Sequence, residues 1–470
     1  MMGKRKGNVW LVFVVLAATF SWAQTPAGLS ADDQKKIDEI VTKTLSETGA
    51  PSASLAVVRD GQIVYEHAYG LANLEMKMAA QPTMRYCIGS ISKQFTASAI
   101  LMLAEQKKLS LDDPVSKYVP KLTRGNEVTI RQLLSMTSGY QDFWPQDYVM
   151  PMMMQPASAE FILDHWARIP LDFEPGTKWQ YSNTNYVIAG LILEKAAGMP
   201  MLDFMKQRMF APLRMNSVVS MHVAKENPVG PVGYLKYALG PPRPAPKEGK
   251  GWMFAAGELA MTASDLARWD ISLIEGKLLT PASYQALERE TLLKNGAPTG
   301  YALGVGVRMD QDRRVLSHGG EVSGFVAQNL VYPDDRAAVV VLTNLDASGA
   351  AGQIARKIAP LLFPAADKSM EERLQLVRRI FDGLQKGQIE RSLLTDNCNS
   401  YFSEQAIKDF ADSLGPLGTP AEFKQSSRGE RGGMEFRSYT VKFSGGKTAR
   451  IIVYVMPDGK IEQYQAMAAE

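Results

Sequence analysis

The chain has 470 residues, 46% hydrophobic and 21% charged, which is the composition of an ordinary globular protein long enough for two or three domains. Its 52 lysines and arginines nearly balance 49 aspartates and glutamates, which leaves a net charge of +3. So small a net charge gives no electrostatic reason to expect a nucleic acid or an anionic membrane as partner.

Residues 1–23 have the organisation of a secretory signal peptide. Basic residues at 4–6 precede an apolar run at 9–18, and residues 21–23 (Ser-Trp-Ala) offer the small side chains of a cleavage site. Cleavage after Ala23 predicts an exported protein, periplasmic or extracellular, with no stable membrane anchor. The apolar run is too short to span a bilayer comfortably, but an uncleaved anchor is the alternative.

The mature chain is predicted to begin with a helix and a hairpin. Ser30, followed by Ala-Asp-Asp, is typical of a helix N-terminus, and residues 37–45 repeat apolar side chains at helical spacing. Two strand-like runs, 53–58 and 63–69, are joined by Asp-Gly at 60–61, which is a strong hairpin signal.

The middle of the chain, from about 110 to 300, is predicted to consist of helices and long loops. The expected helices are 129–136, 158–167, 185–197 and one starting at Thr262. Loop 143–156 holds Trp144 and four methionines. Because methionine is an adaptable packing residue, this loop could wall a pocket or could simply be buried.

Strands are predicted again after residue 300. They are expected at 304–309, 314–317, 325–332 and 337–343, with a helix at 350–362. The economical arrangement is an α+β domain over 30–363, in which one antiparallel sheet built from both ends is flanked by helices and a helical segment is inserted.

A second unit is predicted after an expected linker at 364–368. Residues 369–470 contain two helical stripes followed by a meander of strands, which indicates a small α+β domain of unknown role. The two cysteines, Cys87 and Cys398, are far apart in sequence and are predicted to be buried thiols, with a disulfide as the alternative.

The stretch 87–95 places Ser90 at the mouth of an apolar helix, with Lys93 three residues on. Positions three apart lie on one helix face, so the amine can reach the hydroxyl. A serine becomes a nucleophile when a base takes its proton, and a desolvated lysine can serve as that base. A helix cap explains Ser90 equally well. A second Ser-x-x-Lys, starting at Ser444, is interpreted as a plain turn.

Two further stretches carry chemistry. In Tyr181-Ser-Asn183, a nearby ammonium could lower the pKa of the tyrosine phenol, so that the phenolate acts as a base. The Asn183 amide is able to hold Lys93. The sequence Ser-His-Gly-Gly-Glu at 317–321 offers two glycines that let backbone approach a ligand. The alternatives are a buried structural tyrosine and a plain glycine turn.

Together and in this order, these three motifs resemble the serine β-lactamase and penicillin-binding protein superfamily. The pattern is most similar to the class C branch, which also contains D,D-peptidases, D-aminopeptidases and esterases. The resemblance covers roughly 30–363 and includes the phrases Leu-Leu-Ser-Met-Thr-Ser-Gly at 133–139 and Glu-Pro-Gly at 174–176.

The resemblance implies a serine hydrolase that forms a covalent acyl-enzyme, with no metal or organic cofactor. It implies that Ser90 is the nucleophile, Lys93 its partner and Tyr181 the general base. It implies that Asn183 is a substrate-binding amide and that His318, Gly319 and Gly320 stand in the place of Lys-Thr-Gly or His-Thr-Gly. The implied oxyanion hole is formed by the backbone N–H groups of Ser90 and Glu321.

One departure from that pattern bears on the substrate. Class C β-lactamases have a lysine in the place of His318 and a hydroxyl residue in the place of Gly319, and both help to hold a substrate carboxylate. An esterase, amidase or D-amino-acid peptidase therefore fits better than a true β-lactamase or D,D-carboxypeptidase. An inactive protein that binds cell-wall fragments is an alternative of another class.

Other hydrolytic chemistries are poorly supported by the sequence. The chain has only four histidines and no Gly-x-Ser-x-Gly, so a Ser-His-Asp triad is disfavoured. No spacing of His, Asp and Glu suggests a metal-ligand set.

Overall fold

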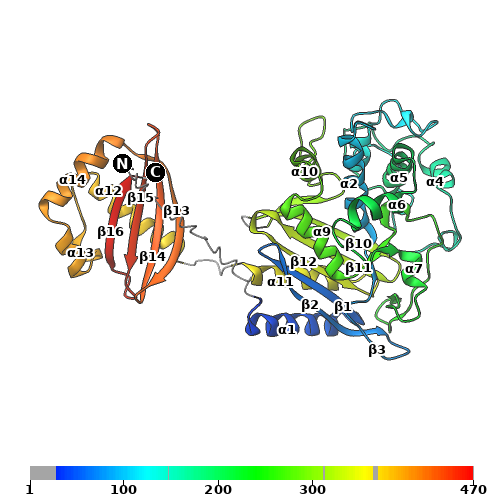
Figure 1. Cartoon of the computed structure of the whole chain (residues 1–470), viewed down its shortest axis with the longest axis horizontal. Helices are drawn as coiled ribbons and strands as arrows, with labels where there is room; N and C mark the ends of the chain where they lie inside the picture. Colours follow the sequence, from blue (N-terminus) through cyan, green and yellow to red (C-terminus); the bar gives the residue numbers. More distant parts are fainter. Residues whose placement is uncertain (1–27, 147, 311–312, 364–368, 469–470) are drawn as a thin grey trace, which may run out of the picture. The chain divides into compact units, whose positions relative to one another are not determined.

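A computed structural model describes residues 28–146, 148–310, 313–363 and 369–468 (Figure 1). The expected signal peptide and the expected linker at 364–368 lie outside these residues. The chain divides after Phe363 into two compact units, which are described separately below. Within the described ranges, no helix has the length and apolar character needed to cross a membrane.

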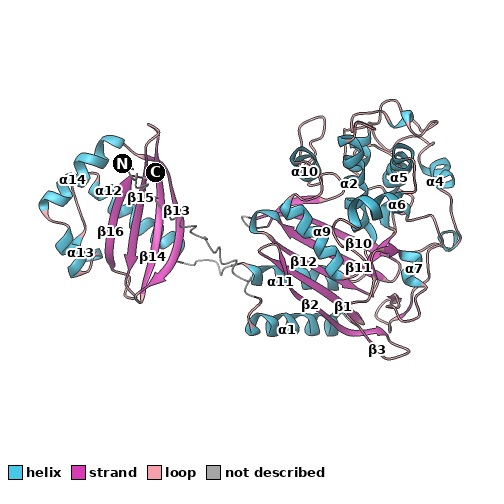
Figure 2. Ribbon diagram, in the orientation of Figure 1, coloured by secondary structure: helices cyan, strands magenta, loops and turns pink. Residues whose placement is uncertain are grey.

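The first unit is built on a seven-stranded antiparallel sheet (Figure 2). Its strands, in spatial order, are β3 (Met78–Ala79), β2 (Gln62–Asn73), β1 (Ser52–Arg59), β12 (Ala337–Thr343), β11 (Phe325–Tyr332), β10 (Arg313–Val322) and β9 (Gly306–Asp310). The N-terminal hairpin and the C-terminal strands therefore form one sheet, which confirms the predicted α+β class.

Strand β12 lies at the centre and is buried on both faces. Val339 and Val341 join the core beneath helix α1 (Ala31–Thr48) and helix α11 (Ala350–Ile358). Val340 and Leu342 point to the opposite face, into the larger core formed with the other helices. This two-sided burial explains why 337–343 is a continuous apolar run rather than an alternating one.

The larger core is covered by helices from the middle of the chain. They are α2 (Ser92–Glu105), α3 (Ile130–Leu134), α4 (Ala159–Trp166), α5 (Asn183–Ala197), α6 (Met201–Met205), α7 (Met221–Lys225), α8 (Phe254–Gly257), α9 (Ala263–Glu275) and α10 (Pro281–Glu288). Two smaller sheets complete the unit: β4 (Tyr86–Cys87), β8 (Leu259–Met261) and β5 (Val219–Ser220); and β6 (Tyr234–Leu235) with β7 (Arg243–Pro244).

Several predicted helix ends are confirmed by their caps. The side chains of Ser30, Thr129, Ser158 and Thr262 each accept a hydrogen bond from a backbone N–H in the first turn. Several boundaries differ from the prediction, for example that of β2, which runs to Asn73 and not to 69, and two of them lie at the candidate site. Helix α5 begins two residues earlier than predicted, and strand β10 continues past the predicted end at 317 to Val322. The third motif is therefore part of a strand and not a turn.

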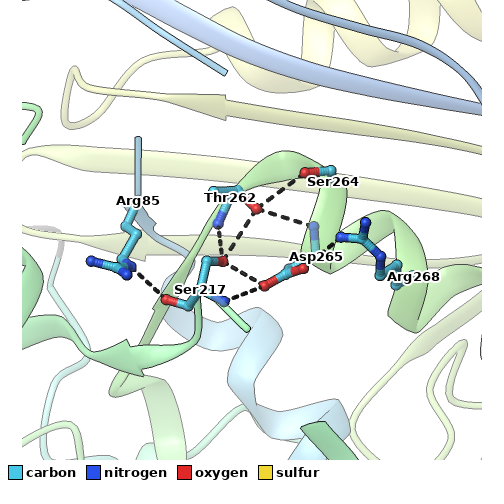
Figure 3. Close-up of polar contacts among 6 residues, drawn as sticks. All are labelled: Arg85, Ser217, Thr262, Ser264, Asp265 and Arg268. Carbon is cyan, nitrogen blue, oxygen red and sulfur yellow. Dashed lines mark hydrogen bonds and ion pairs between the residues drawn. The ribbon is translucent and has the colours of Figure 1, made fainter. Parts of the chain in front are cut away.

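A polar network ties the start of α9 to the segment that leads into α2 (Figure 3). Asp265 accepts hydrogen bonds from the N–H and the hydroxyl of Ser217, both at 2.6 Å, and pairs with Arg268. The carbonyl of Ser217 accepts a hydrogen bond from Arg85 Nε at 2.6 Å. Because Arg85 directly precedes β4, the network fixes the chain just before the first motif.

The second unit packs three helices on a four-stranded antiparallel sheet. The helices are α12 (Met370–Leu384), α13 (Asp396–Tyr401) and α14 (Glu404–Leu414), and the strands are β13 (Pro420–Arg431), β14 (Met434–Phe443), β15 (Thr448–Val455) and β16 (Ile461–Ala468). Sequence analysis missed α13, which is short and polar. Cys87 and Cys398 are both free and buried, as predicted.

We predict that the two units fold independently, because each has an apolar core made only of its own residues. Fragments 28–363 and 369–470, expressed separately, should each show cooperative urea unfolding with a midpoint close to the corresponding transition in the full chain. Near-ultraviolet circular dichroism would report tertiary packing. A fragment 369–470 that is soluble but lacks cooperative unfolding would contradict this expectation.

Candidate active site

Ser90 lies in a single 3-10 turn, Gly89–Ile91, directly before helix α2. It does not cap the helix, because Ile91 occupies the N-cap position and makes no side-chain cap bond. The partly exposed Ser90 side chain instead accepts a hydrogen bond from Lys93 Nζ at 2.9 Å. The cap interpretation is therefore wrong, and the predicted one-turn spacing does bring the amine to the hydroxyl.

Lys93 is fully buried in the first turn of α2. Its amine donates to Ser90 Oγ, to Asn183 Oδ1 at 2.8 Å and to the Ala256 carbonyl at 2.7 Å. These three acceptors match the three N–H donors of an ammonium. Burial lowers the pKa of Lys93 to about 7, against the opposing attraction of the Asp142 carboxylate. The group can therefore exchange its proton near neutral pH.

Tyr181 packs beside this amine, with Lys93 Nζ 4.9 Å from the centre of its ring. Desolvation raises the pKa of Tyr181, and the interaction with the Ser90 hydroxyl only partly opposes that shift. The predicted lowering of the Tyr181 pKa was therefore wrong. At neutral pH the side chain is therefore a phenol, which can donate and relay a proton.

Asn183 is oriented by a carboxylate that sequence analysis did not identify. Asp142 accepts hydrogen bonds from the Asn183 N–H at 2.9 Å and from its Nδ2 at 3.2 Å, which turns Oδ1 toward Lys93. It also accepts the N–H of Trp144. Since Ser182 occupies the N-cap position of α5 without a side-chain bond, Asp142 acts as the anion at that helix N-terminus.

His318 is buried on β10, with its ring centre 6.2 Å from that of Tyr181. Its Nδ1 faces the Gly319 carbonyl, which can only accept, so the proton is on Nδ1 and Nε2 accepts from the Tyr301 hydroxyl at 2.9 Å. Burial and the charge of Lys93 lower the pKa of His318 to about 4. The imidazole is therefore neutral at pH 7.

The two glycines of the third motif have different surroundings. A Cβ on Gly320 would lie 1.8 Å from the carbonyl oxygen of Ile88, whereas a Cβ on Gly319 would meet only Gln328 Oε1, at 3.8 Å. On the facing segment, a Cβ on Gly89 would lie 2.6 Å from the Glu321 nitrogen. The chain segments carrying Ser90 and Glu321 therefore pack backbone against backbone.

A cavity of about 490 Å³ opens over Ser90. Its lining residues are Ser90, Asp142, Trp144, Pro145, Gln146, Gln180, Tyr181, Asn183, Met253, Glu321 and Asp346. Of the predicted site residues, this lining includes Ser90, Tyr181, Asn183 and Glu321. It does not include Lys93, His318, Gly319 or Gly320. Within the described ranges, no three His, Cys, Asp or Glu side chains gather as a metal site.

Loop 143–156, predicted either to wall a pocket or to be buried, forms only part of the cavity wall. Trp144 lines the cavity, but the methionines do not. Met153 is fully buried in a separate apolar cluster, and Met152 and Met154 are exposed. The start of the loop therefore lines a pocket, as one interpretation predicted, and Met153 is buried, as the other predicted.

Comparison with known proteins places this geometry in context. The family described as Beta-lactamase matches residues 37–362. Protein flp of Staphylococcus aureus (strain N315) is 28% identical over 331 residues, which cover 68% of this chain and 64% of that protein. The chain thus spans about 64% of the length of this curated relative.

Solved structures show the same fold. The octameric penicillin-binding protein homologue from Pyrococcus abyssi matches with a TM-score of 0.62 at 21% identity, over 93% of this chain and 96% of that one. A D-stereospecific amidohydrolase from Streptomyces sp. matches with a TM-score of 0.60 at 25% identity, over 70% and 98%. These neighbours confirm the predicted fold for the first unit.

We predict that Gly320→Ala is destabilising and that Gly319→Ala, its neighbour in the same motif, is nearly neutral. The added methyl on Gly320 collides with backbone, and such overpacking costs about 1–3 kcal/mol in the free energy of unfolding. Urea unfolding of both variants would measure the difference. Equal stabilities would show that β10 can move away from the Ser90 turn at little cost.

We also predict that Asp142→Asn lowers the pKa of Lys93 below about 7, because it removes the carboxylate whose attraction favours the ammonium. A ¹³C NMR titration of lysine labelled at Cε would follow the change, with the Lys93 signal assigned by its loss in Lys93→Arg. Asp164→Asn, an exposed change on α4, is the matched control. A raised Lys93 pKa in Asp142→Asn would contradict the assignment.

Proposed function

Because this chain belongs to the beta-lactamase family, we propose that it is a serine hydrolase with Ser90 as its nucleophile. The observation that carries the proposal is the 2.9 Å hydrogen bond between Lys93 Nζ and Ser90 Oγ, at an amine whose pKa is lowered to about 7. When the amine is neutral, Asn183 and Ala256 accept its two N–H groups. Its lone pair then faces the Ser90 hydroxyl and can take the proton.

The proposed reaction proceeds through an acyl-enzyme. Ser90 Oγ attacks the carbonyl carbon of an ester or amide while its proton passes to Lys93. The backbone N–H groups of Ser90 and Glu321 hold the oxyanion. Collapse expels the alcohol or amine, which takes a proton from Lys93 relayed through the Tyr181 hydroxyl. Water then attacks the acyl carbon while Lys93 takes its proton through the Tyr181 hydroxyl, and Ser90 Oγ leaves, regains a proton from Lys93 and releases the acid.

The proposed substrates are esters, amides or D-amino-acid peptides. His318 is neutral and hydrogen-bonded to Tyr301, and Gly319 has no hydroxyl, so this strand offers neither the charge nor the hydroxyl that holds a β-lactam carboxylate in class C enzymes. A charge-assisted hydrogen bond contributes about 1.5–3 kcal/mol, so its loss weakens carboxylate binding. The structurally similar protein from Streptomyces sp., a D-stereospecific amidohydrolase, supports amide substrates.

Two alternatives make different predictions. A true β-lactamase or D,D-carboxypeptidase would hydrolyse nitrocefin or D-alanyl-D-alanine peptides efficiently. An inactive binding protein for cell-wall fragments would show neither turnover nor an adduct, although the contacts between Lys93 and Ser90 disfavour it. Export to the periplasm or the medium remains a proposal based on residues 1–23 alone.

We predict that a fluorophosphonate probe labels the wild-type protein once, at Ser90, and that Ser90→Ala abolishes both labelling and hydrolysis of p-nitrophenyl acetate. Loss of the nucleophile removes the covalent route, so the rate should fall by about a thousandfold or more. Ser444→Ala is the matched control, because it alters the second Ser-x-x-Lys, which the structure places in an exposed turn. An unchanged adduct mass on Ser90→Ala would refute the assignment.

A further inference from the structure

Two carboxyl side chains belong to the wall of the cavity that also holds Ser90. Glu321 lies near the end of β10, and Asp346 follows β12. The N–H of Ala347 donates to both acids, at 2.8 Å to Glu321 Oε1 and at 2.9 Å to Asp346 Oδ1. The N–H of Asp346 itself donates to the Tyr234 carbonyl at 2.8 Å. Backbone hydrogen bonds therefore hold the two acids together, although one lies on β10 and the other in the turn after β12.

This pair of acids has no cationic side chain beside it among the described residues that line the cavity. Burial and the neighbouring Glu321 carboxyl raise the pKa of Asp346 to about 8, so near neutral pH the Asp346 carboxyl largely keeps its proton. None of the residues that line the cavity in the described part of the chain is Lys, Arg or His, and the other titratable lining groups are Asp142 and Tyr181. The nearby ammonium, Lys93, already has three acceptors.

The same cavity holds the nucleophile and an aromatic side chain. In the proposed reaction the acyl group attacked by Ser90 lies in this space. Trp144 is an aromatic side chain of the same wall, and aromatic rings attract cations. An ammonium on the acyl group has three donors and could take the place of the proton on Asp346 between the two acids. A carboxylate at the same place would meet like charge, which costs binding energy.

We propose that this cavity selects acyl donors that carry a free primary amine, with the ammonium bound by Glu321 and Asp346. The inference rests on the proposed function, because the amine is selected through its place on the group that Ser90 attacks. The substrates are then amides or esters of amino acids and of peptides with a free amino terminus. Donors with a blocked or acidic group at that position should be poor substrates.

The test compares three D-alanine p-nitroanilides that differ only at nitrogen: the free amine, the N-acetyl and the N-succinyl form. For the full chain at about pH 7, kcat/KM should be about tenfold or more higher for the free amine than for the N-acetyl form, and lowest for the N-succinyl form. The three anilides should slow fluorophosphonate labelling of Ser90 in the same order, so recognition is measured even where turnover is slow.

Two variants locate the effect. In Asp346→Asn, the ratio of kcat/KM for the free amine to kcat/KM for the N-acetyl form should fall close to one. Asp334→Asn, which alters an exposed acid outside the cavity, should leave the preference unchanged. Equal treatment of the free amine and N-acetyl forms by a protein that is labelled at Ser90 would overturn amine selection and leave the hydrolase proposal intact. Absence of labelling would overturn the hydrolase proposal, and this inference with it.

Discussion

The site depends on the burial of one amine. Removing an ammonium from water costs several kcal/mol unless its hydrogen bonds are replaced, and Lys93 receives one acceptor each from the Ser90 turn, α5 and α8. Those helices must therefore approach one another closely. Gly190 on α5 makes this possible, because a Cβ there would lie 2.4 Å from the Phe254 ring and 2.6 Å from the Ala255 Cβ on α8.

The oxyanion side of the site is fixed by a second set of contacts, beyond the end of β10. The Ser323 N–H donates to Glu248 at 2.7 Å, and its carbonyl accepts from Lys225 at 2.9 Å. Lys225 and Glu248 form an ion pair at 2.6 Å that is almost fully buried. Such a pair contributes little net stability but defines geometry, because each charge requires its partner. It holds the strand end next to Glu321, whose N–H is proposed to bind the oxyanion.

The parts of this structure that could be read from the sequence are those set by local physics. Caps such as Thr262, the Asp-Gly hairpin and the one-turn spacing of Ser90 and Lys93 follow from short-range geometry. Asp142 could not be found, because a lone aspartate in a loop has no pattern. The pKa of Tyr181 was predicted in the wrong direction because the sequence reveals a neighbouring charge but not the desolvation that outweighs it. The extent of β10 was missed because glycines favour turns, and only pairing with β11 keeps them extended.

The charge of the substrate and the basicity of Lys93 act on each other. Burial keeps the Lys93 pKa low, and a nearby carboxylate such as Asp142 raises it. A substrate carboxylate in the cavity would raise it further and would hold the amine in its ammonium form, which cannot accept the Ser90 proton. A substrate ammonium between Glu321 and Asp346 would have the opposite effect and would favour the neutral amine. His318, which is neutral and buried, adds no positive charge to this balance. An amine-bearing substrate would therefore be bound by the acids of the cavity and would also increase the share of Lys93 that can act as the base.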